Sequence, residues 1–310
     1  MSTNDLLSPE EVLEQVAQAL PEKLRENVII IGSLAAGYYF FAADGNAGIR
    51  TKDVDCMLSP HVSAVSAAAE VTHRLRSCAW TQREDARFGS AGDASVPDEK
   101  LPMVRLHPPT GTQWFLELMS APPPYVHRGP MKQFERITTA EGDYAICSFG
   151  YLGLVEWEPL KTSTGIKIAR PEMMALANML HHPRISDQLI DGTNDKRSNK
   201  DLGRVLALAH LTISRDRARG TELFEEWPKS MYAALNDKFA EHAGDLAAHA
   251  GSGIAQLLSS PQDLNQALAI ANRGLLACLD IDLAAIAATG RRLQADVLDR
   301  LAKYGELWRH

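Results

Sequence analysis

The chain has 310 residues, of which 45% are hydrophobic, a formal net charge of −7 and a mean hydropathy of −0.18. This composition supports one large domain or two smaller ones, and the negative charge argues against a generally basic nucleic-acid binder. No apolar run is long enough to cross a bilayer, and four scattered cysteines indicate neither a disulfide framework nor a zinc site. Because residues 1–14 are polar and acidic, we expect a cytoplasmic protein with buried thiols and no membrane partner.

The first elements along the chain are a helix, a strand and a second helix. A helix is expected over residues 8–20, with proline and acidic side chains in its first turn. The unbroken apolar run 28–31 is short enough to be a buried strand. Gly32 and Ser33 follow at once, and residues 34–41 are expected to be helical. This turn would place free backbone N–H groups at a helix N-terminus, which suits a phosphate.

Residues 50–58 are expected to form the next strand. Because side chains alternate along a strand, Asp53 and Asp55 would share one face, while Val54 and Cys56 would point into the core. Two carboxylates a few ångströms apart repel each other unless a cation lies between them. The pair therefore predicts a site for a hard divalent metal, and a phosphate at the preceding helix would complete the parts of a nucleotide-handling site.

The rest of the first half is expected to alternate between helices, strands and loops. The expected elements are a helix at 60–76, a strand at 78–83, a mobile surface loop at 88–100, a hairpin of strands at 101–107 and 112–119, a surface crossing that contains His127, Arg128 and Lys132, and strands at 143–149 and 153–157.

The second half is expected to be helical, so the domains are placed at residues 1–160 and 161–310. A helix begins with a proline and covers residues 171–180, and stripes rich in alanine and leucine follow it. His181 and His182 would stand at the end of this helix, where a positively inclined side chain suits the dipole. No motif of a serine hydrolase, a Walker-type NTPase or a dinucleotide-binding fold is present.

Two motifs carry a resemblance to a known superfamily. The order strand, Gly32-Ser33, helix, followed by Arg50-Thr51-x-Asp53-x-Asp55 on the next strand, resembles the nucleotidyltransferase superfamily of the DNA polymerase β type. In the helical half, the segment 171–180, Arg184 and the Lys200-Asp201 pair that opens a helix resemble the AbiE-type toxin nucleotidyltransferases and their uncharacterised relatives. The resemblance covers about residues 25–215 and is firmest at the first motif.

The resemblance implies an α/β fold in which a mixed sheet flanked by helices is followed by an all-helical domain, with the active site in the cleft between them. It also implies nucleotidyl transfer from an NTP with two Mg²⁺ ions, for which Mn²⁺ could substitute. The implied site residues are Asp53 and Asp55 for the metals, Gly32, Ser33, Arg50, Thr51, Lys167 and Lys200 for the nucleotide, and Asp201 for the acceptor or a metal-bound water.

Glu117 has two interpretations. It stands in the second arm of the hairpin, amid apolar residues, where burial of an unpaired carboxylate is costly. In the first interpretation this arm is an edge strand and Glu117 lies in water. In the second, Glu117 is the third metal-binding carboxylate, which the resembled superfamily supplies from a later strand of the same sheet. The presence of Asp53 and Asp55 favours the second interpretation.

Asn178 departs from the pattern of the resembled toxins. These carry a lysine on the corresponding helix, which helps to neutralise a triphosphate, so Lys167 or Lys200 would have to supply the charge here. The implied acceptor is an RNA end or a protein hydroxyl, and a cognate antitoxin protein is an implied partner. Two alternatives stay open: a degenerate nucleotidyltransferase fold that binds a nucleotide or partner without turnover, and an enzyme that modifies a small molecule of the aminoglycoside type.

Overall fold

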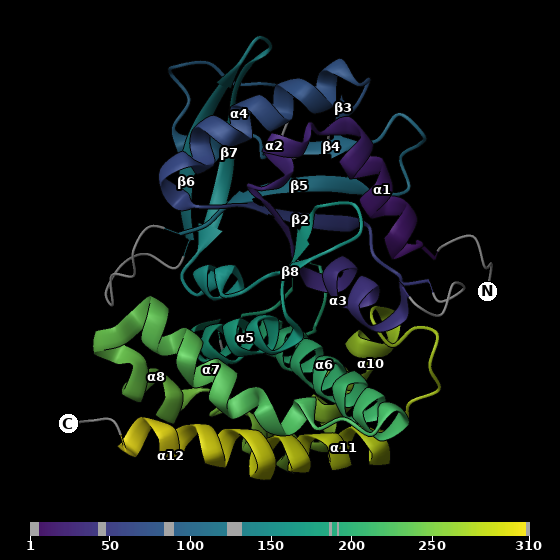
Figure 1. The fold of residues 1–310 in the computed structure, drawn as a ribbon, viewed down its shortest axis with the longest axis vertical. Helices are drawn as coiled ribbons and strands as arrows, with labels where there is room; N and C mark the ends of the chain where they lie inside the picture. The colour runs from purple at the N-terminus through teal and green to yellow at the C-terminus, as the bar shows by residue number, and fades with distance from the viewer. Residues whose placement is uncertain are drawn as a thin grey trace. The chain divides into compact units, whose positions relative to one another are not determined.

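The computed structural model describes residues 6–42, 48–83, 90–122, 132–185, 188–190 and 192–307 (Figure 1). The predicted surface residues His127 and Arg128 lie outside these ranges, as do the side chains of Lys132 and Arg184. The chain forms two compact units, and each has its own core. The first unit is Met1–Tyr38 with Thr51–Ala169, and the second is Tyr39–Arg50 with Arg170–His310.

The first unit is built on a mixed sheet. Its strands are β1 Val28–Ile30, β2 Asp53–Leu58, β3 Thr81–Gln82, β4 Arg105–His107, β5 Phe115–Ser120, β6 Lys132–Thr139, β7 Gly142–Phe149, β8 Leu160–Lys161 and β9 Lys167–Ile168. Among the described residues these nine strands join in the order β3-β4-β5-β2-β1-β9-β8, and the hairpin β6–β7 is attached through β5. β2 pairs in parallel with β5 and antiparallel with β1. The strand that carries the two aspartates therefore lies in the interior of the sheet.

Helices cover this sheet, including three that the sequence predicts and others that it does not. They are α1 Pro9–Ala19, α2 Glu22–Arg25, α3 Gly32–Phe41, α4 His61–Ser77 and the 3-10 helices η3 Asp98–Lys100 and η4 Leu152–Glu156. The hydroxyl of Ser8 accepts a hydrogen bond from the backbone N–H of Glu11, which caps α1. α4 packs against β6 and against the central strands β2 and β5.

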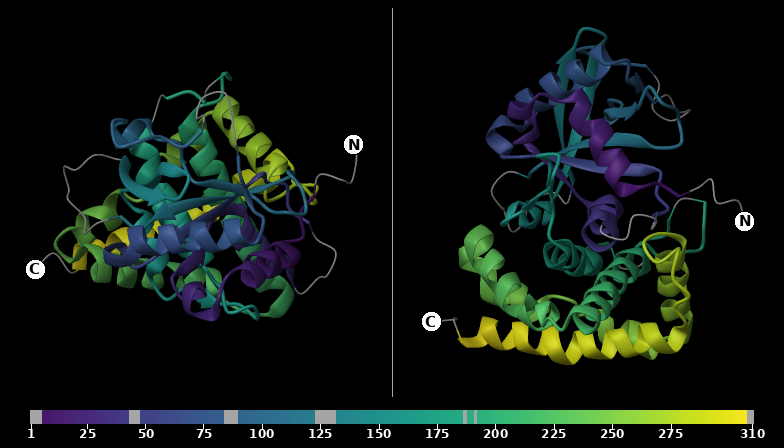
Figure 2. Two further views of the ribbon diagram at one scale, coloured as in Figure 1. Left: turned by 90° about the horizontal axis from the view of Figure 1, so that it is seen from above. Right: turned by 45° about the vertical axis from the view of Figure 1, so that its right-hand side comes forward.

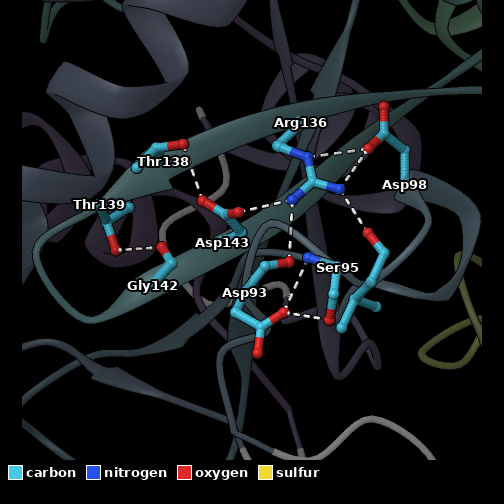
Figure 3. Close-up of polar contacts among 9 residues, drawn as sticks. Asp93, Ser95, Asp98, Arg136, Thr138, Thr139, Gly142 and Asp143 are labelled. Atoms are coloured by element: carbon cyan, nitrogen blue, oxygen red, sulfur yellow. Dashed lines mark hydrogen bonds and ion pairs between the residues drawn. The ribbon is translucent and has the colours of Figure 1, made fainter.

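A single arginine of β6, Arg136, fixes residues 90–100 to the hairpin β6–β7 (Figure 3). Its guanidinium donates to two carboxylates and two main-chain carbonyls, those of Asp98, Asp143, Asp93 and Val96. Gly92 and Asp143 also exchange two backbone hydrogen bonds of 2.9 Å. The hydrogen bond from Thr138 and the bond and charge of Arg136 lower the pKa of Asp143. The part of the predicted mobile surface loop that the structure describes is thus held to the hairpin by several hydrogen bonds.

The second unit is built from helices. They are α5 Pro171–Ile185, α6 Arg197–Arg219, α7 Leu223–Phe239, η5 Ala240–His242, α8 Ala243–His249, α9 Ile254–Ser259, α10 Pro261–Arg273, α11 Leu283–Arg292, the π-helix η6 Leu293–Leu298 and α12 Asp299–Leu307. A Cβ atom on Gly203 of α6 would lie 2.6 Å from the carbonyl oxygen of Ala267, so this glycine lets α6 and α10 approach closely. The last three helices follow one another without a break, as the long yellow helix of Figure 2 shows.

The structure confirms a mixed α/β sheet followed by a helical region. Within the part of the chain that it describes, no helix has both the length and the apolar character that a membrane span requires. The sheet continues through the strand pair β8–β9, so the two units divide after Ala169.

Several expected elements are wrong. Residues 153–156 belong to the 3-10 helix η4, which Trp157 caps, and not to a strand, because a short buried apolar run fits either structure. The segment expected as a surface crossing leads into β6, which begins at Lys132. α5 continues to Ile185, so His181 and His182 lie inside the helix and not at its end.

The cysteines are only partly as expected. None of the four, all of which lie in the described ranges, forms a disulfide bond; Cys56 and Cys147 are buried, whereas Cys78 and Cys278 are exposed.

Candidate functional site

A row of polar side chains crosses the sheet of the first unit. Glu117 of β5 stands in register with Asp55 of β2 on one side and with Arg105 of β4 on the other. Residues in register on neighbouring strands share a face of the sheet and lie about 5 Å apart. The pairing of strands distant in sequence therefore brings Asp55, Glu117 and Arg105 side by side.

The N-terminus of α3 continues this row beyond Asp55. α3 begins at Gly32, whose φ of +69° is a conformation that L side chains rarely adopt. A Cβ atom at Gly32 would lie 2.8 Å from Oδ2 of Asp55, and the backbone N–H of Ile31 donates to the carbonyl of Asp55 at 3.0 Å. The positive φ therefore favours glycine at this turn, a Cβ atom there would crowd the Asp55 carboxylate, and the start of a helix lies directly against that carboxylate.

The second aspartate of the strand is oriented by its neighbour in the motif. Asp53 shares a face of β2 with Asp55, and the buried Val54 points the other way. The hydroxyl of Thr51 lies 3.0 Å from Oδ1 of Asp53 and 2.9 Å from its carbonyl oxygen. The preceding Arg50 has a buried Nε without a hydrogen-bond partner among the described residues.

Glu117 is neither at an edge nor in water. β5 lies between β2 and β4, and the Glu117 side chain is only 15% exposed. Nε of Arg105 donates to Oε2 of Glu117 at 2.6 Å, which offsets the cost of burying the carboxylate. The edge-strand interpretation is therefore wrong, and the sequence reasoning missed Arg105. The hairpin itself held the signal, because Arg105 faces Glu117 across its two arms.

Cys56, which follows Asp55 on β2, is not a ligand candidate. It is fully buried, and burial together with the charge of Asp55 raises the pKa of its thiol to about 12. A protonated, inward-facing thiol is neither a nucleophile nor a metal ligand.

At the predicted metal site, Asp53 and Asp55 are suitable metal ligands, whereas the third carboxylate, Glu117, is bound by Arg105 through one of its oxygens. Asp53 and Asp55 offer hard oxygen ligands on one strand face, next to a glycine turn whose φ L side chains rarely adopt. One oxygen of Glu117 is held by Arg105. In the described part of the chain, no group of three or more His, Cys, Asp or Glu side chains is arranged to hold a metal ion.

Lys167 is directed away from this site. Its Nζ donates to the carbonyl of Glu26 at 2.7 Å, and Glu26 precedes β1 whereas Gly32 follows it. In this arrangement the ammonium group lies near the opposite end of β1 from Ser33.

The remaining predicted residues lie in the second unit, on α5 and α6. Nδ1 of His181 lies 2.7 Å from Oδ2 of Asp201, which is buried in the first turns of α6 next to Lys200. Asn178 donates from Nδ2 to the carbonyl of Met174 at 2.7 Å, within its own helix. The sequence reasoning did not foresee the His181–Asp201 pair, because it placed the histidines at a helix end.

His182 is a second buried polar group on α5. Both of its ring nitrogens are buried without a hydrogen-bond partner among the described residues, and its ring packs against Gly253, where there is no room for a side chain. Burial lowers the pKa of His182, against the opposing charge of Asp201.

The first unit thus gathers Gly32, Ser33, Asp53, Asp55 and Glu117, while the second unit holds Asp201, Lys200 and Asn178 on two neighbouring helices. A scan against protein-family models and searches of curated proteins and of solved structures found no match to the chain. The geometry of these residues is therefore the basis for a functional proposal.

Proposed function

We propose that the chain is a metal-dependent nucleotidyltransferase that moves an NMP from an NTP to a hydroxyl acceptor. The observation that carries this proposal is the approach of Gly32 to Asp55, so close that a Cβ atom on the glycine would lie 2.8 Å from the carboxylate oxygen. It brings a helix N-terminus, suited to phosphate, against a carboxylate that shares its strand face with Asp53. Phosphate-binding and cation-binding groups are needed side by side for this reaction.

The chain's own groups would hold the nucleotide as follows. The first N–H groups of α3, from Ser33 onward, have no partner within the helix and would donate to the outer phosphates, aided by the helix dipole. The Ser33 hydroxyl would add a donor, and Thr51 would keep the Asp53 carboxylate in place. A phosphate contact from Arg50 stays a prediction from the resemblance.

Asp53 and Asp55 fit a Mg²⁺ ion, and Glu117 would join them through Oε1, since Nε of Arg105 donates to its Oε2. Mg²⁺ bound there would supply the charge that neutralises the polyphosphate and the leaving pyrophosphate. Arg105 would fix the orientation of Glu117, as partners of ligating carboxylates commonly do. For the acceptor, an RNA end or a protein hydroxyl, with Asp201 as a positioning residue and an antitoxin as partner, stays a prediction from the resemblance.

The test is a transfer assay with the purified full-length chain, Mg²⁺ and labelled NTPs, offered total RNA, protein and an aminoglycoside as separate acceptors. Wild type should label one acceptor class, and Asp55→Asn should abolish the labelling while it preserves the fold. Glu99→Gln, an exposed carboxylate of the same unit, is the matched control and should remain active. Undiminished labelling by Asp55→Asn would refute the proposal.

One observation favours a second candidate, the degenerate fold that binds a nucleotide without turnover. The 2.6 Å ion pair between Arg105 and Oε2 of Glu117 leaves only one oxygen of Glu117 for a metal. Calorimetry and the labelling assay together separate the candidates. The degenerate protein should bind NTP in the calorimeter but label no acceptor, and Glu117→Gln should leave its NTP affinity unchanged. In an active enzyme, Glu117→Gln should lower the transfer rate.

A further inference from the structure

The sheet face that carries the proposed site continues past Glu117 onto two further strands. β4 pairs with β5 on one side and with β3 on the other. The backbone N–H of Arg83, directly after β3, donates to the carbonyl of Arg105 at 2.7 Å, so Arg83 extends the pairing of β3 with β4 by one residue. Residues opposite each other on paired strands share a face. The row that begins at Asp55 therefore ends at Arg83, along the strands β2, β5, β4 and β3 (Figure 1).

The guanidinium of Arg83 reaches back across this face. Its Cζ lies 4.2 Å from the centre of the Phe115 ring, and Phe115 of β5 stands in register with Asp53 of β2. A guanidinium stacked on a ring keeps its N–H donors at the edges of its own plane, where an anion can approach them. A cation thus lies over β5, the strand next to the one that carries the two aspartates.

The surroundings of Arg83 differ from those of Arg105. Arg105 is paired with Glu117 at 2.6 Å, whereas the described residues contain no ion-pair partner of Arg83. Phe115 is 7% exposed and Arg83 is partly exposed, so the arginine lies on the solvent side of the ring that it covers. Arginine in such a position can form a bidentate contact with a phosphate.

We propose that Arg83 binds a phosphate group of the acceptor, close to the hydroxyl that receives the NMP. This inference rests on the proposed nucleotidyltransferase function. The hydroxyl oxygen bonds to the α-phosphorus, the bond to pyrophosphate breaks, pyrophosphate keeps the electron pair, and the hydroxyl proton passes to water. The attacking and leaving oxygens of such a transfer are roughly in line, on opposite sides of the phosphorus.

The two ends of the row match these two sides. The N-terminus of α3, where pyrophosphate would leave, follows β1 and lies on the β1 side of Asp55. The acceptor would therefore approach over Glu117, on the opposite side of Asp55, where the row ends at Arg83. A phosphorylated acceptor suits the charge of Arg83, and a polycation such as an aminoglycoside does not. The phosphate could belong to a polynucleotide end or to a small phosphorylated alcohol.

The test measures binding by calorimetry, with the full-length chain and Mg²⁺ but without NTP, so that it does not depend on turnover. The probes are a tetraribonucleotide with a free 3′-hydroxyl and ribose 5-phosphate. Their uncharged counterparts are a methylphosphonate-linked tetranucleotide and ribose, and an aminoglycoside is a further comparison. At least one phosphate probe should bind, about tenfold or more tightly than its uncharged counterpart and than the aminoglycoside. The tighter of the two probes identifies the source of the phosphate.

Three variants link this binding to Arg83. Arg83→Met removes the charge and should weaken binding of the phosphate probe by about tenfold or more, whereas Arg83→Lys should weaken it less. Arg74→Met changes an exposed arginine of the same unit and should bind like wild type. Thermal melting of each variant checks that it is folded. In the transfer assay, Arg83→Met should raise the KM for the acceptor and leave the KM for NTP unchanged.

Three results would overturn the assignment: no binding of either phosphate probe by wild type, wild-type affinity in Arg83→Met, or a raised KM for NTP in place of the acceptor. Probe binding that depends on Arg83 in a protein that transfers nothing would support the phosphate site and count against the proposed activity. Failure of the site and failure of the activity are therefore distinguishable.

Discussion

One carboxylate of the first unit and two histidines of the second unit have pKa values shifted by opposite kinds of surroundings. In the first unit, carboxylates are paired with donors along a sheet, as Glu117 is with Arg105 and Asp143 with Thr138 and Arg136, and the pKa of Asp143 is lowered. In the second unit, burial lowers the pKa of His182 and of His210. The first environment favours a charged group and the second a neutral one. Strong acid should therefore destabilise the sheet unit through Asp143, and mild acid should destabilise the helical unit through His182 and His210.

The largest expected difference between the units concerns transfer activity. Asp53→Asn removes a proposed metal ligand on a strand, whereas Asp201→Asn alters a carboxylate that orients His181 in the helical unit. We expect Asp53→Asn to lower the transfer rate by more than the roughly 10- to 100-fold that loss of an outer partner of a metal ligand costs, and Asp201→Asn, at a predicted positioning residue for the acceptor, to lower it less. Steady-state rates with saturating NTP provide the measurement. Equal decreases of the transfer rate in the two variants would contradict the proposed difference between the roles of the two units.

The next prediction compares two glycines with similar backbone angles. Gly32 of the sheet unit has φ +69° and Gly220 of the helical unit has φ +64°, but only Gly32 has a neighbour within 4 Å of a built Cβ, namely Asp55. Gly220→Ala should cost about 1–2 kcal/mol of unfolding free energy from backbone strain alone. Gly32→Ala should cost more, as urea unfolding will measure.

A double variant isolates the cause of that excess. When Asp55→Ala is combined with Gly32→Ala, the cost of the glycine substitution should fall towards that of Gly220→Ala, because the obstructing carboxylate is gone. If the cost of Gly32→Ala is the same with and without Asp55, the contact does not determine the choice of glycine.

The helical unit should lose stability between neutral and mildly acidic pH. Because the folded pKa of His182 lies below the unfolded value of about 6.5, its contribution is complete above that pH and falls away as the unfolded chain takes up a proton. The slope is at most about 1.4 kcal/mol per pH unit for one proton. His182→Leu should flatten the slope between pH 7 and 5, whereas the exposed His249→Leu, in the same unit, should not.

The smallest expected effect lies in the sheet unit at strong acid. The lowered pKa of Asp143 means that its stabilising contribution is present above the unfolded value of about 3.9 and is lost as the pH falls through the folded value. Asp143→Asn should therefore flatten the stability profile below pH 4 and leave the profile from pH 5 to 7 parallel to wild type. A change of slope near neutral pH in this variant would contradict the assignment.

Local patterns were sufficient to predict the core of the sheet unit. The apolar run of β1, the alternation of Asp53 and Asp55 with buried neighbours, and the hairpin β4–β5 follow from a period of two residues and from turn residues, which act over short distances. β6 was not predicted, because the polar residues in its sequence resemble those of a loop. Its strand structure depends on pairing with β7 and on packing against α4, which its own sequence does not reveal.

The site was predictable only as far as strand geometry determines it. Gly32, Asp53 and Asp55 lie where a strand, a turn and a second strand must bring them. The Arg105–Glu117 pair needed the hairpin register, and the His181–Asp201 pair needed the packing of α5 on α6. Helical periodicity shows which face of a helix is apolar, but not which residue of another helix will meet it.

The π-helix η6 determines how the continuous helix formed by α11, η6 and α12 responds to the deletion or insertion of a residue. Buried positions recur along this helix at Ile286, Gly290, Leu293, Val297, Leu301 and Gly305. From the first of these to the last, the chain advances one residue further than five turns of an ideal α-helix require. The wide turn of η6 absorbs that residue and so keeps both arms on the same face. Deletion of one residue within 293–298 should therefore restore a regular α-helix with its buried stripe aligned, whereas a further insertion there should rotate α12 by about 100°.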